Sequence, residues 1–471
     1  ESGEVMESDY FKLDFKEGQK PQDKGSIMTY MRRYTAGSFF GLSSDDDNDG
    51  IPDSEDDLPL DPAESVDSDN DGVGDNSDNC RTTANADQLN SDTDPRGDAC
   101  DPFPQDASLV MQYDGSAKKQ FLGASLAMAD MNNDGFMDLL VGVPQANAFV
   151  LGVLAKKVGE IRIYSGADGS LLRTLSGQAA NQRFGTTIAA VPDQNEDGVA
   201  DVLVGEPLAD VSVFTTTGTS KLKDAGRVAL YSGQTGRLIR TVVEGSVRGD
   251  RLGAAVAVAD VNGEEVGDLI AGAPYADALV KDAGQLKVVD GLSDTVLYSR
   301  NGVQIGEHFG AALAHAGGKL YIGSPEFDGV ELKDSGRLQV FDSAEGSSAA
   351  LLALPGLSKA ERLGTSVAAS GSLWAVGAPG ADPAAIKDAG TVQVFDGMTS
   401  SPILSKTGSQ IAAGYGSALN WQADLNGDAI ADLAIGAMKF DLVVPAYGKT
   451  LVQKDTGRVQ VWSGSDLQGV Q

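Results

Sequence analysis

The sequence predicts an all-β fold, a β-propeller of six blades preceded by an irregular, acid-rich segment. Glycine accounts for 58 of the 471 residues and aromatic residues for only 6%, which favours short strands and tight turns over long helices. After residue 106 one pattern of strands and turns recurs six times, at steps of 52 to 68 residues. One four-stranded sheet cannot bury both of its faces alone, and units of this period are typical of propeller blades.

The composition divides the chain into residues 1–44, 45–106 and 107–471. The first part is rich in aromatic residues and mixed in charge, and it matches no motif. We expect it to be an arm that covers its own protein or docks on a partner subunit as an added strand. Because the sequence starts with Glu1 rather than Met, we expect either that an export signal has been removed or that the sequence is a fragment.

The second part, residues 45–106, holds 21 acidic and two basic residues, a large share of the chain's net charge of −32. Side-chain oxygens fall at positions 1, 3, 5, 9 and 12 of three successive loops, all from aspartate except Asn90, with a residue at position 7 that would offer its backbone carbonyl. The first loop has Asp45, Asp47, Asp49, Ile51, Asp53 and Asp56. The second loop has Asp67, Asp69, Asp71, Val73, Asp75 and Asp78. The third loop has Asn90, Asp92, Asp94, Arg96, Asp98 and Asp101.

This spacing predicts calcium binding. Alternate carboxylates on a tightly curved chain direct their oxygens to one centre, and calcium takes six to eight oxygen ligands. Glycine at position 6 permits the turn in the first two loops, whereas Pro95 replaces it in the third. Prolines around the first and third loops exclude the flanking helices of an EF-hand. We expect two or more ions here, with the loops packing on the ions and on each other.

Cys80 and Cys100 are the only cysteines, and both lie in this acidic segment. They could form one disulfide in an oxidising compartment or remain two free thiols. The segment is otherwise too polar to hold itself together, which favours the disulfide.

The stretches DSDNDGVGDNSDNC and NADQLNSDTDPRGDACDP resemble thrombospondin type-3 repeats, and the 20-residue step between the cysteines fits the spacing of that family. The resemblance covers about residues 45–106. It implies a chain that wraps a string of calcium ions with almost no hydrophobic core.

Each repeat of the third part predicts a sheet of four strands in order. The first strand follows an aromatic residue or leucine and a glycine, at Leu122, Phe184, Leu252, Phe309, Leu363 and Tyr415. The second is a short apolar run such as LLVGVP, and the third is a segment such as GRVALYSG. The fourth, such as LLRTLSG, is absent from the last unit, while SLVMQYDG precedes the first unit and matches it.

We therefore expect this N-terminal strand to complete the last blade, which removes the open sheet edges and gives six blades. A seventh blade built from the first 44 residues is the alternative. The units resemble the FG-GAP repeats of the integrin α-subunit propeller over residues 107–471. Integrin propellers have seven blades, so six is a departure from that family.

Four units carry an oxygen-rich loop between their first and second strands, with side-chain oxygens at positions 1, 3, 5 and 9 and a backbone carbonyl at position 7. The first has Asp130, Asn132, Asp134, Phe136 and Asp138. The second has Asp193, Asn195, Asp197, Val199 and Asp201. The third has Asp260, Asn262, Glu264, Val266 and Asp268. The sixth has Asp424, Asn426, Asp428, Ile430 and Asp432.

Four copies of this loop at the same place in the repeat predict about four calcium ions. The FG-GAP resemblance also implies calcium at this loop. In the third copy the glycine has moved to position 4, and units four and five replace the loop with GGK and SGS. The 21 acids of the second part and the 12 at these liganding positions leave 35 acids against 34 basic residues elsewhere. Nearly all of the net negative charge thus comes from residues of the acid-rich segment and the candidate metal loops.

In a four-stranded meander the calcium loops share one propeller face, and the loops between strands two and three share the opposite face. The resemblance implies ligand binding on that opposite face. Five of these loops end in Lys-Asp-small-Gly, starting at Lys223, Lys281, Lys333, Lys387 and Lys454. This motif predicts either a ring of ligand contacts or a turn device, and five like copies favour the turn.

No feature predicts an enzyme. His308 and His315 would lie roughly 20 Å apart on an extended strand, and no phosphate loop, HExxH or GxSxG is present. A polysaccharide-degrading enzyme with paired carboxylates is the weakest alternative. No basic run predicts nucleic-acid binding. The most apolar stretch, Ala148–Ala155, is too short to span a membrane.

The sequence therefore predicts a secreted or cell-surface, calcium-binding, non-enzymatic adhesion or recognition protein. Its propeller would present a loop face to a protein or glycan. The alternative is a structural subunit of an extracellular assembly, with residues 1–44 making the contacts between subunits.

Overall fold

The computed structural model describes residues 51, 55–91, 96–101, 104–105, 109–150, 152–215, 218–264, 267–291, 293–344, 346, 349–425, 430–446 and 449–468. The chain forms two compact units, residues 1–89 and 90–471. The proposed arm at residues 1–44 lies outside the described residues. So do Asp45, Asp47, Asp49 and Asp53 of the first acidic loop and Asp92 and Asp94 of the third.

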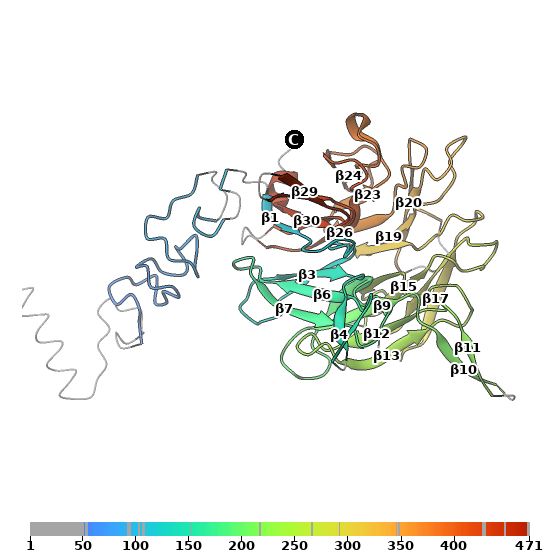
Figure 1. The fold of residues 1–471 in the computed structure, drawn as a ribbon, viewed down its shortest axis with the longest axis horizontal. Helices are drawn as coiled ribbons and strands as arrows, with labels where there is room; N and C mark the ends of the chain where they lie inside the picture. The colour runs from blue at the N-terminus through green and yellow to red at the C-terminus, as the bar shows by residue number, and fades with distance from the viewer. Residues whose placement is uncertain are drawn as a thin grey trace, which may run out of the picture. The chain divides into compact units, whose positions relative to one another are not determined.

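The second unit is a six-bladed propeller, and every blade is an antiparallel sheet of four strands (Figure 1). Blade 1 comprises β2 (Leu126–Ala129), β3 (Asp138–Val143), β6 (Glu160–Tyr164) and β7 (Leu171–Ser176). Blade 2 comprises β8 (Thr187–Val191), β9 (Asp201–Glu206), β12 (Arg227–Tyr231) and β13 (Leu238–Glu244). Blade 3 comprises β14 (Ala255–Ala259), β15 (Asp268–Ala273), β16 (Gln285–Val289) and β17 (Val296–Asn301). Blade 4 comprises β18 (Ala312–Ala316), β19 (Lys319–Ser324), β20 (Arg337–Asp342) and β21 (Leu352–Pro355). Blade 5 comprises β22 (Ser366–Ser370), β23 (Leu373–Ala378), β24 (Thr391–Asp396) and β25 (Leu404–Thr407).

Blade 6 closes the ring with strands from both ends of the unit. It comprises β26 (Tyr415–Ala423), β27 (Asp432–Ala437), β30 (Arg458–Trp462) and β1 (Leu109–Asp114). At the end of the β1–β30 ladder Asp114 lies opposite Arg458, whose Nε is 2.6 Å from Asp114 Oδ1. The predicted closure and the predicted six blades are confirmed.

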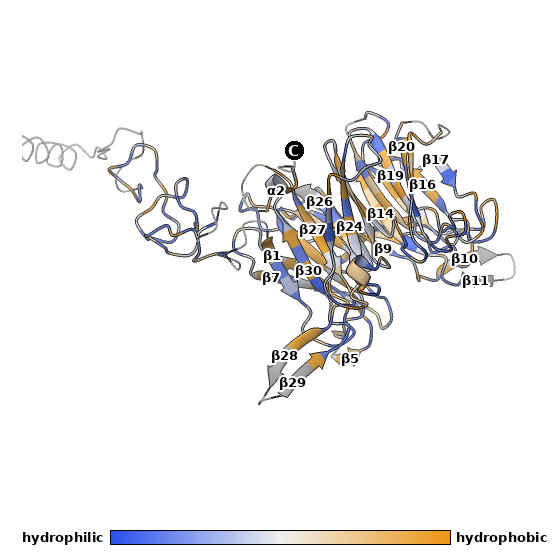
Figure 2. Ribbon diagram, turned by 90° about the horizontal axis from the view of Figure 1, so that it is seen from above, coloured by the Kyte–Doolittle hydropathy of each residue, from blue (hydrophilic) through white to orange (hydrophobic). Residues whose placement is uncertain are grey.

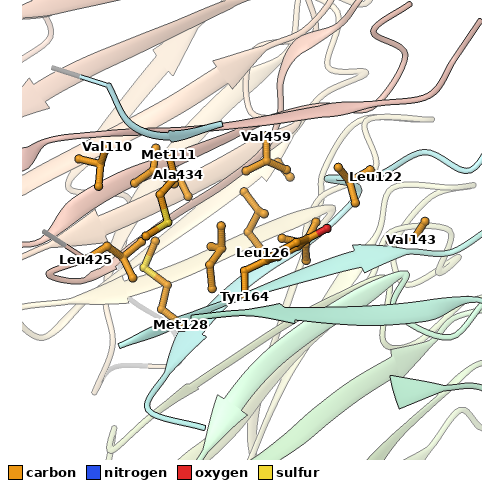
Figure 3. Close-up of a cluster of buried hydrophobic side chains, with 14 of the residues drawn as sticks. Val110, Met111, Leu122, Leu126, Met128, Val143, Tyr164, Leu425, Ala434 and Val459 are labelled. Atoms are coloured by element: carbon orange, nitrogen blue, oxygen red, sulfur yellow. The ribbon is translucent and has the colours of Figure 1, made fainter. Parts of the chain in front are cut away.

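The core lies between neighbouring blades. The second strands of blades 1, 2, 3 and 6 are buried at all six positions, because each is covered by a blade on either side. Figure 3 shows the cluster at the closing seam, where Val110 and Met111 of β1 pack with Leu126 of blade 1 and Val459 of blade 6. A cavity of about 260 Å³ is lined by the first strands of all six blades.

One glycine contact explains why the repeats contain their two glycines. In every blade the glycine of the second strand faces the carbonyl oxygen of the glycine that starts the next blade, as Gly272 faces Gly310. A Cβ at Gly272 would overlap that oxygen. The same contact at Gly436 and Gly123 joins blade 6 to blade 1. Absence of a side chain therefore sets the spacing between blades.

We expect Gly272→Ala to destabilise the propeller by at least about 3 kcal/mol, because backbone of the next blade must move. The matched control is Gly397→Ala, a glycine with φ +59° and open space around its Cβ position, which should cost only about 1 kcal/mol. Urea unfolding in calcium measures both values. Equal losses in the two variants would contradict the close-contact explanation.

Three of the loops between strands two and three form β-hairpins, which the sequence analysis did not predict. They are β4 (Ala148–Val150) with β5 (Val153–Ala155), β10 (Val211–Thr215) with β11 (Gly218–Leu222), and β28 (Leu442–Ala446) with β29 (Lys449–Gln453). Figure 2 shows β5, β28 and β29 extending to the same side of the propeller. The helical pieces are short: η1 (Pro383–Ala385) and α2 (Gly464–Gln468). Among the described residues, no helix is long and apolar enough to cross a bilayer.

Candidate metal loops and the opposite loop face

The loop between β8 and β9 brings its predicted ligands together. One carboxylate oxygen from each of Asp193, Asp197 and Asp201 lies within 4.8 Å of the others. Asp193 accepts backbone N–H bonds from Glu196 (2.8 Å) and Gly198 (2.8 Å), which curl the chain around it. These bonds, that of Gly198 above all, hold the pKa of Asp193 below its usual range. Three ionised oxygens at this separation form a donor set for a hard divalent cation.

The loop between β2 and β3 has the same backbone hydrogen bonds, although its three carboxylates do not come within 4.8 Å of one another. Asp130 accepts from the N–H groups of Asn133 (2.6 Å) and Gly135 (3.0 Å), and Asp134 accepts from that of Phe136 (2.8 Å). The side chain of Asn133 donates to Gly198 O at 2.5 Å, so the loops of blades 1 and 2 are joined.

The aspartate at position 9 of each loop has a structural bond that the sequence did not reveal. Asp138, Asp201, Asp268 and Asp432 are at most 1% exposed. One oxygen of each accepts the N–H of position 2 of its loop, at 2.8–2.9 Å. The other oxygen accepts an N–H from the turn after the third strand, at 2.9–3.1 Å, and the donors are Gly166, Gly233, Gly291 and Gly464.

Burial acts against the charge on these carboxylates. It raises the pKa of Asp138 to about 6, and it also raises the pKa of Asp201. A bound cation would stabilise the ionised form, so the buried carboxylates fit a metal site. A recurring Ser-Gly or Asp-Gly after the third strand was the sequence signal for the partner turn.

Blades 4 and 5 show what replaces this aspartate where the loop is short. Ser343 N–H donates to Gly318 O (3.0 Å), and Gly397 N–H donates to Ser372 O (2.9 Å). A backbone carbonyl of the tight hairpin thus takes the place of the carboxylate. The position-9 aspartate therefore holds the long loops in place whether or not metal is bound.

We expect Asp201→Ala and Asp193→Asn to change the melting temperature in different ways. Asp201→Ala removes two buried backbone bonds and should lower the melting temperature in chelator as well as in calcium. Asp193→Asn keeps an acceptor oxygen on an exposed loop and should reduce only the calcium-dependent part of the melting temperature. Differential scanning calorimetry of each variant with calcium and with chelator measures this. Identical profiles would show that position 9 has no separate structural role.

The other two propeller loops are described in part. In blade 3, Asp260 accepts from Gly263 N–H (2.7 Å), and Asn262 donates to Asp290 (3.1 Å). Val266 lies outside the described residues, as do Asn426 and Asp428 of blade 6. Asp424 and Ile430 are described at the two ends of that loop.

In the first unit, Asp67, Asp69 and Asp71 of the second acidic loop have oxygens within 4.8 Å of one another. Asp67 accepts from the N–H groups of Asn70 (2.8 Å) and Gly72 (2.9 Å), as position 1 does in the propeller loops. Burial, followed by repulsion from Asp71 and Asp78, raises the pKa of Asp69. Three of the five carboxylates predicted for this loop thus lie together, and their role as metal ligands stays a prediction.

Polar contacts hold the rest of the described part of the first unit. Cys80 is the one apolar side chain buried among residues 55–89. Glu64, which the sequence analysis missed, is 4% exposed and accepts from Asn76 N–H (3.0 Å) and Ser77 Oγ (2.6 Å). Asp75 binds both N–H and Oγ of Ser68 at 2.8 Å. Both cysteines of the chain are disulfide-bonded, which confirms the predicted disulfide.

The third acidic loop contributes an unexpected side chain to the second unit. Arg96 is buried, and its Nη2 donates to Gly166 O (2.5 Å) and Leu425 O (2.8 Å). Gly166 follows the third strand of blade 1, and Leu425 belongs to the candidate metal loop of blade 6. Arg96 thus spans the closing seam, whereas the sequence predicted only a backbone role for it. Asp98 binds Ser91 as Asp75 binds Ser68, at 2.7 Å and 2.6 Å.

The opposite face carries the Lys-Asp-small-Gly motifs, and their geometry supports the turn interpretation. The carbonyls of Lys223, Lys281, Lys333, Lys387 and Lys454 each accept an N–H from the loop that leads to the next blade, at 2.9–3.2 Å. The aspartates that follow adopt φ between +50° and +53°, a conformation that aspartate tolerates. Their N–H groups donate to an aspartate at the start of the same loop, for example Asp388 to Asp382 (2.7 Å).

The two histidines have separate partners. His308 Nδ1 is 3.0 Å from Glu326 Oε2 on the loop face. His315 lies in the lining of the central cavity, with Nε2 3.2 Å from Ser343 Oγ, and burial lowers its pKa. They do not form a pair.

Comparison with known proteins agrees with the propeller. Residues 122–159 match the family model of the FG-GAP repeat. The chain is 31% identical over 159 residues to integrin alpha-8 of Gallus gallus, covering 33% of this chain and 14% of that protein. It is 31% identical over 194 residues to phosphatidylinositol-glycan-specific phospholipase D of Bos taurus, covering 39% and 22%. It is 28% identical over 209 residues to integrin alpha-5 of Xenopus laevis, covering 42% and 18%. The chain spans less than a quarter of the length of these relatives.

Proposed function

We propose that this protein is an extracellular, calcium-binding, non-enzymatic recognition protein whose loop face binds a protein ligand. The single observation that carries the proposal is the distribution of exposed apolar side chains. Twelve of them project from the loops between strands two and three or between blades, with exposures of 48–92%. At the other end of the blades, where the candidate metal loops lie, seven described apolar side chains are exposed, at 38–54%. Exposed apolar side chains on one face are typical of a protein-binding surface.

The similarity to integrin alpha chains supports an adhesion role at the cell surface or in secreted form. Calcium would be held by the carboxylates of the four propeller loops and of the type-3-like loops, where it neutralises clustered charge. It would fix the loops of one face while the glycine contacts between blades keep the opposite face rigid. A glycan ligand, and self-assembly through residues 1–44, remain predictions from the sequence alone.

An array of extracellular proteins and glycans, probed with the whole chain in calcium, tests the proposal. We expect protein binding that Val330→Ser/Leu357→Ser weakens about tenfold, since both side chains are at least 80% exposed on the loop face. The control is Val296→Ser/Leu351→Ser at the other end of the blades. Binding to glycans only, or equal loss in both variants, would contradict the proposal.

A further inference from the structure

The most apolar stretch of the sequence lies on the surface. In the hairpin β4–β5 the side chains of Phe149, Val153 and Leu154 are 74%, 69% and 58% exposed. Lys156 and Lys157 follow the hairpin directly and are also exposed, and no acidic residue occurs between residues 146 and 159. An exposed apolar hairpin with lysines at its base has no role in the packing of the blades.

Neighbouring loops add further lysines to this part of the face. Lys119 N–H donates to Lys454 O (3.2 Å), Gln145 N–H donates to Gln120 O (3.3 Å), and Arg183 N–H donates to Lys157 O (3.1 Å). The first two bonds connect the loops of blades 6 and 1 around the closing seam, and the third joins the blade 1 connection to the loop that leads to blade 2. We call the exposed lysines of these loops the basic sector: Lys118, Lys119, Lys156, Lys157, Lys439 and Lys454. In the part of the chain that the structure describes, none of the six forms an ion pair.

The far side of the same face has the opposite charge. The blade 4 connection carries Glu326, Asp328, Glu331 and Asp334 against a single lysine, Lys333. In a chain with a net charge of −32, six exposed lysines thus lie on one sector of one face. They come from segments up to 336 residues apart, which is why no basic run is visible in the sequence.

A second hairpin repeats the arrangement on blade 6. Val443 and Val452 of β28–β29 are 54% and 48% exposed, and Lys439 and Lys454 stand at the two ends of the hairpin. Figure 2 shows β28 and β29 on the same side of the propeller as β5. Both hairpins thus combine apolar side chains beyond the face with lysines at its level.

From this combination we propose that the hairpins β4–β5 and β28–β29 and the basic sector dock the protein on an anionic lipid surface. Apolar side chains on a projecting hairpin can enter the boundary between headgroups and acyl chains, while lysines at the base meet the phosphates. An acidic polymer would use the lysines and leave the apolar side chains in water. A neutral protein surface would use the apolar side chains and leave six unpaired cations.

The proposal goes beyond the protein ligand proposed above and does not depend on it. Sedimentation of the whole chain with vesicles tests it, using phosphatidylcholine alone and phosphatidylcholine mixed with phosphatidylglycerol. Each series is run in calcium and in chelator. We expect binding to the anionic vesicles at least about tenfold stronger than to the neutral ones, and weakening with added salt.

Two double variants test which side chains make the contact with the vesicle. Phe149→Ser/Leu154→Ser removes apolar side chains, and Lys118→Glu/Lys454→Glu reverses two charges; each should lower vesicle binding about tenfold. The matched charge control is Lys333→Glu/Lys359→Glu in blade 4, where Ala360 N–H donates to Lys333 O (2.9 Å) as Lys119 N–H does to Lys454 O. The apolar control is Val296→Ser/Leu351→Ser. Both controls should bind vesicles as the unaltered chain does.

Several outcomes would overturn the proposal. Binding that depends on calcium but not on the lysines would show calcium bridging between acidic loops and lipid. Equal binding to neutral vesicles, or equal loss in the controls, would remove the basic sector from the contact. No binding to vesicles, together with lysine-dependent binding to heparin, would assign the sector to an acidic polymer. Calcium calorimetry and the protein array test the proposed function independently of each outcome.

Discussion

Removal of calcium should lower the melting temperature of the propeller by roughly 10 °C or more. A ligand that binds only the folded state at about 100 times its Kd adds about 2.7 kcal/mol per site, so four propeller sites contribute on the order of 10 kcal/mol. The structural reason is the set of carboxylates at each loop. Asp193, Asp197 and Asp201 gather within 4.8 Å, and repulsion among them is uncompensated without a cation.

Chelation of calcium should disrupt the structure of the first unit more than that of the propeller. Among residues 55–89 the buried apolar content is Cys80 alone, so order in this unit depends on polar contacts, the disulfide and bound ions. We expect the unit to lose its compactness in chelator while the propeller is still folded. Calorimetry with small-angle scattering measures both transitions, and magnesium is the control because it demands a tighter octahedral geometry. An unchanged melting temperature in chelator would contradict calcium binding at both sets of loops.

The architecture could be predicted because its signals are local and repeated. A glycine pair, an alternating run and a turn residue recur in each unit, and the strand left over at one end matches the strand missing at the other. The hairpin β4–β5 was missed because AFVLGVLA has the same apolar appearance whether it is buried or exposed. Only the structure shows that the blades already have their core without it.

In the metal loops, too, contacts between residues close in sequence could be predicted, whereas contacts with distant residues could not. Asp193, Asp197 and Asp201 lie within nine residues, so their spacing alone predicts that they meet. The partner of Asp138, the N–H of Gly166, lies 28 residues downstream, and position along the chain gave no reason to connect them. Arg96 was assigned a carbonyl role by its place in a loop, whereas its side chain binds the propeller seam. The third acidic loop and the type-3 resemblance remain predictions.

The largest effect on folding should come from removing β1. A chain of residues 116–471 lacks the outer strand of blade 6, which leaves the edge of β30 unpaired and open to aggregation. It also loses Val110 and Met111 from the seam cluster, about 1.5–3 kcal/mol for each buried side chain, and the ion pair between Asp114 and Arg458. We expect this chain to aggregate or to melt without a cooperative transition.

The control for that truncation is a chain of residues 90–471 that carries Cys100→Ser, because Cys100 would otherwise be left without a partner. It retains β1, the Arg96 contacts and all six blades, so it should melt cooperatively in calcium. A peptide of residues 109–115 added to the shorter chain should restore part of its stability by pairing with β30, as strand addition does at other open sheet edges. If the chain of residues 116–471 melted at the same temperature as the control, blade 6 would be stable with three strands. Closure of the ring by β1 would then be dispensable, and the core between blades would have to hold the propeller on its own.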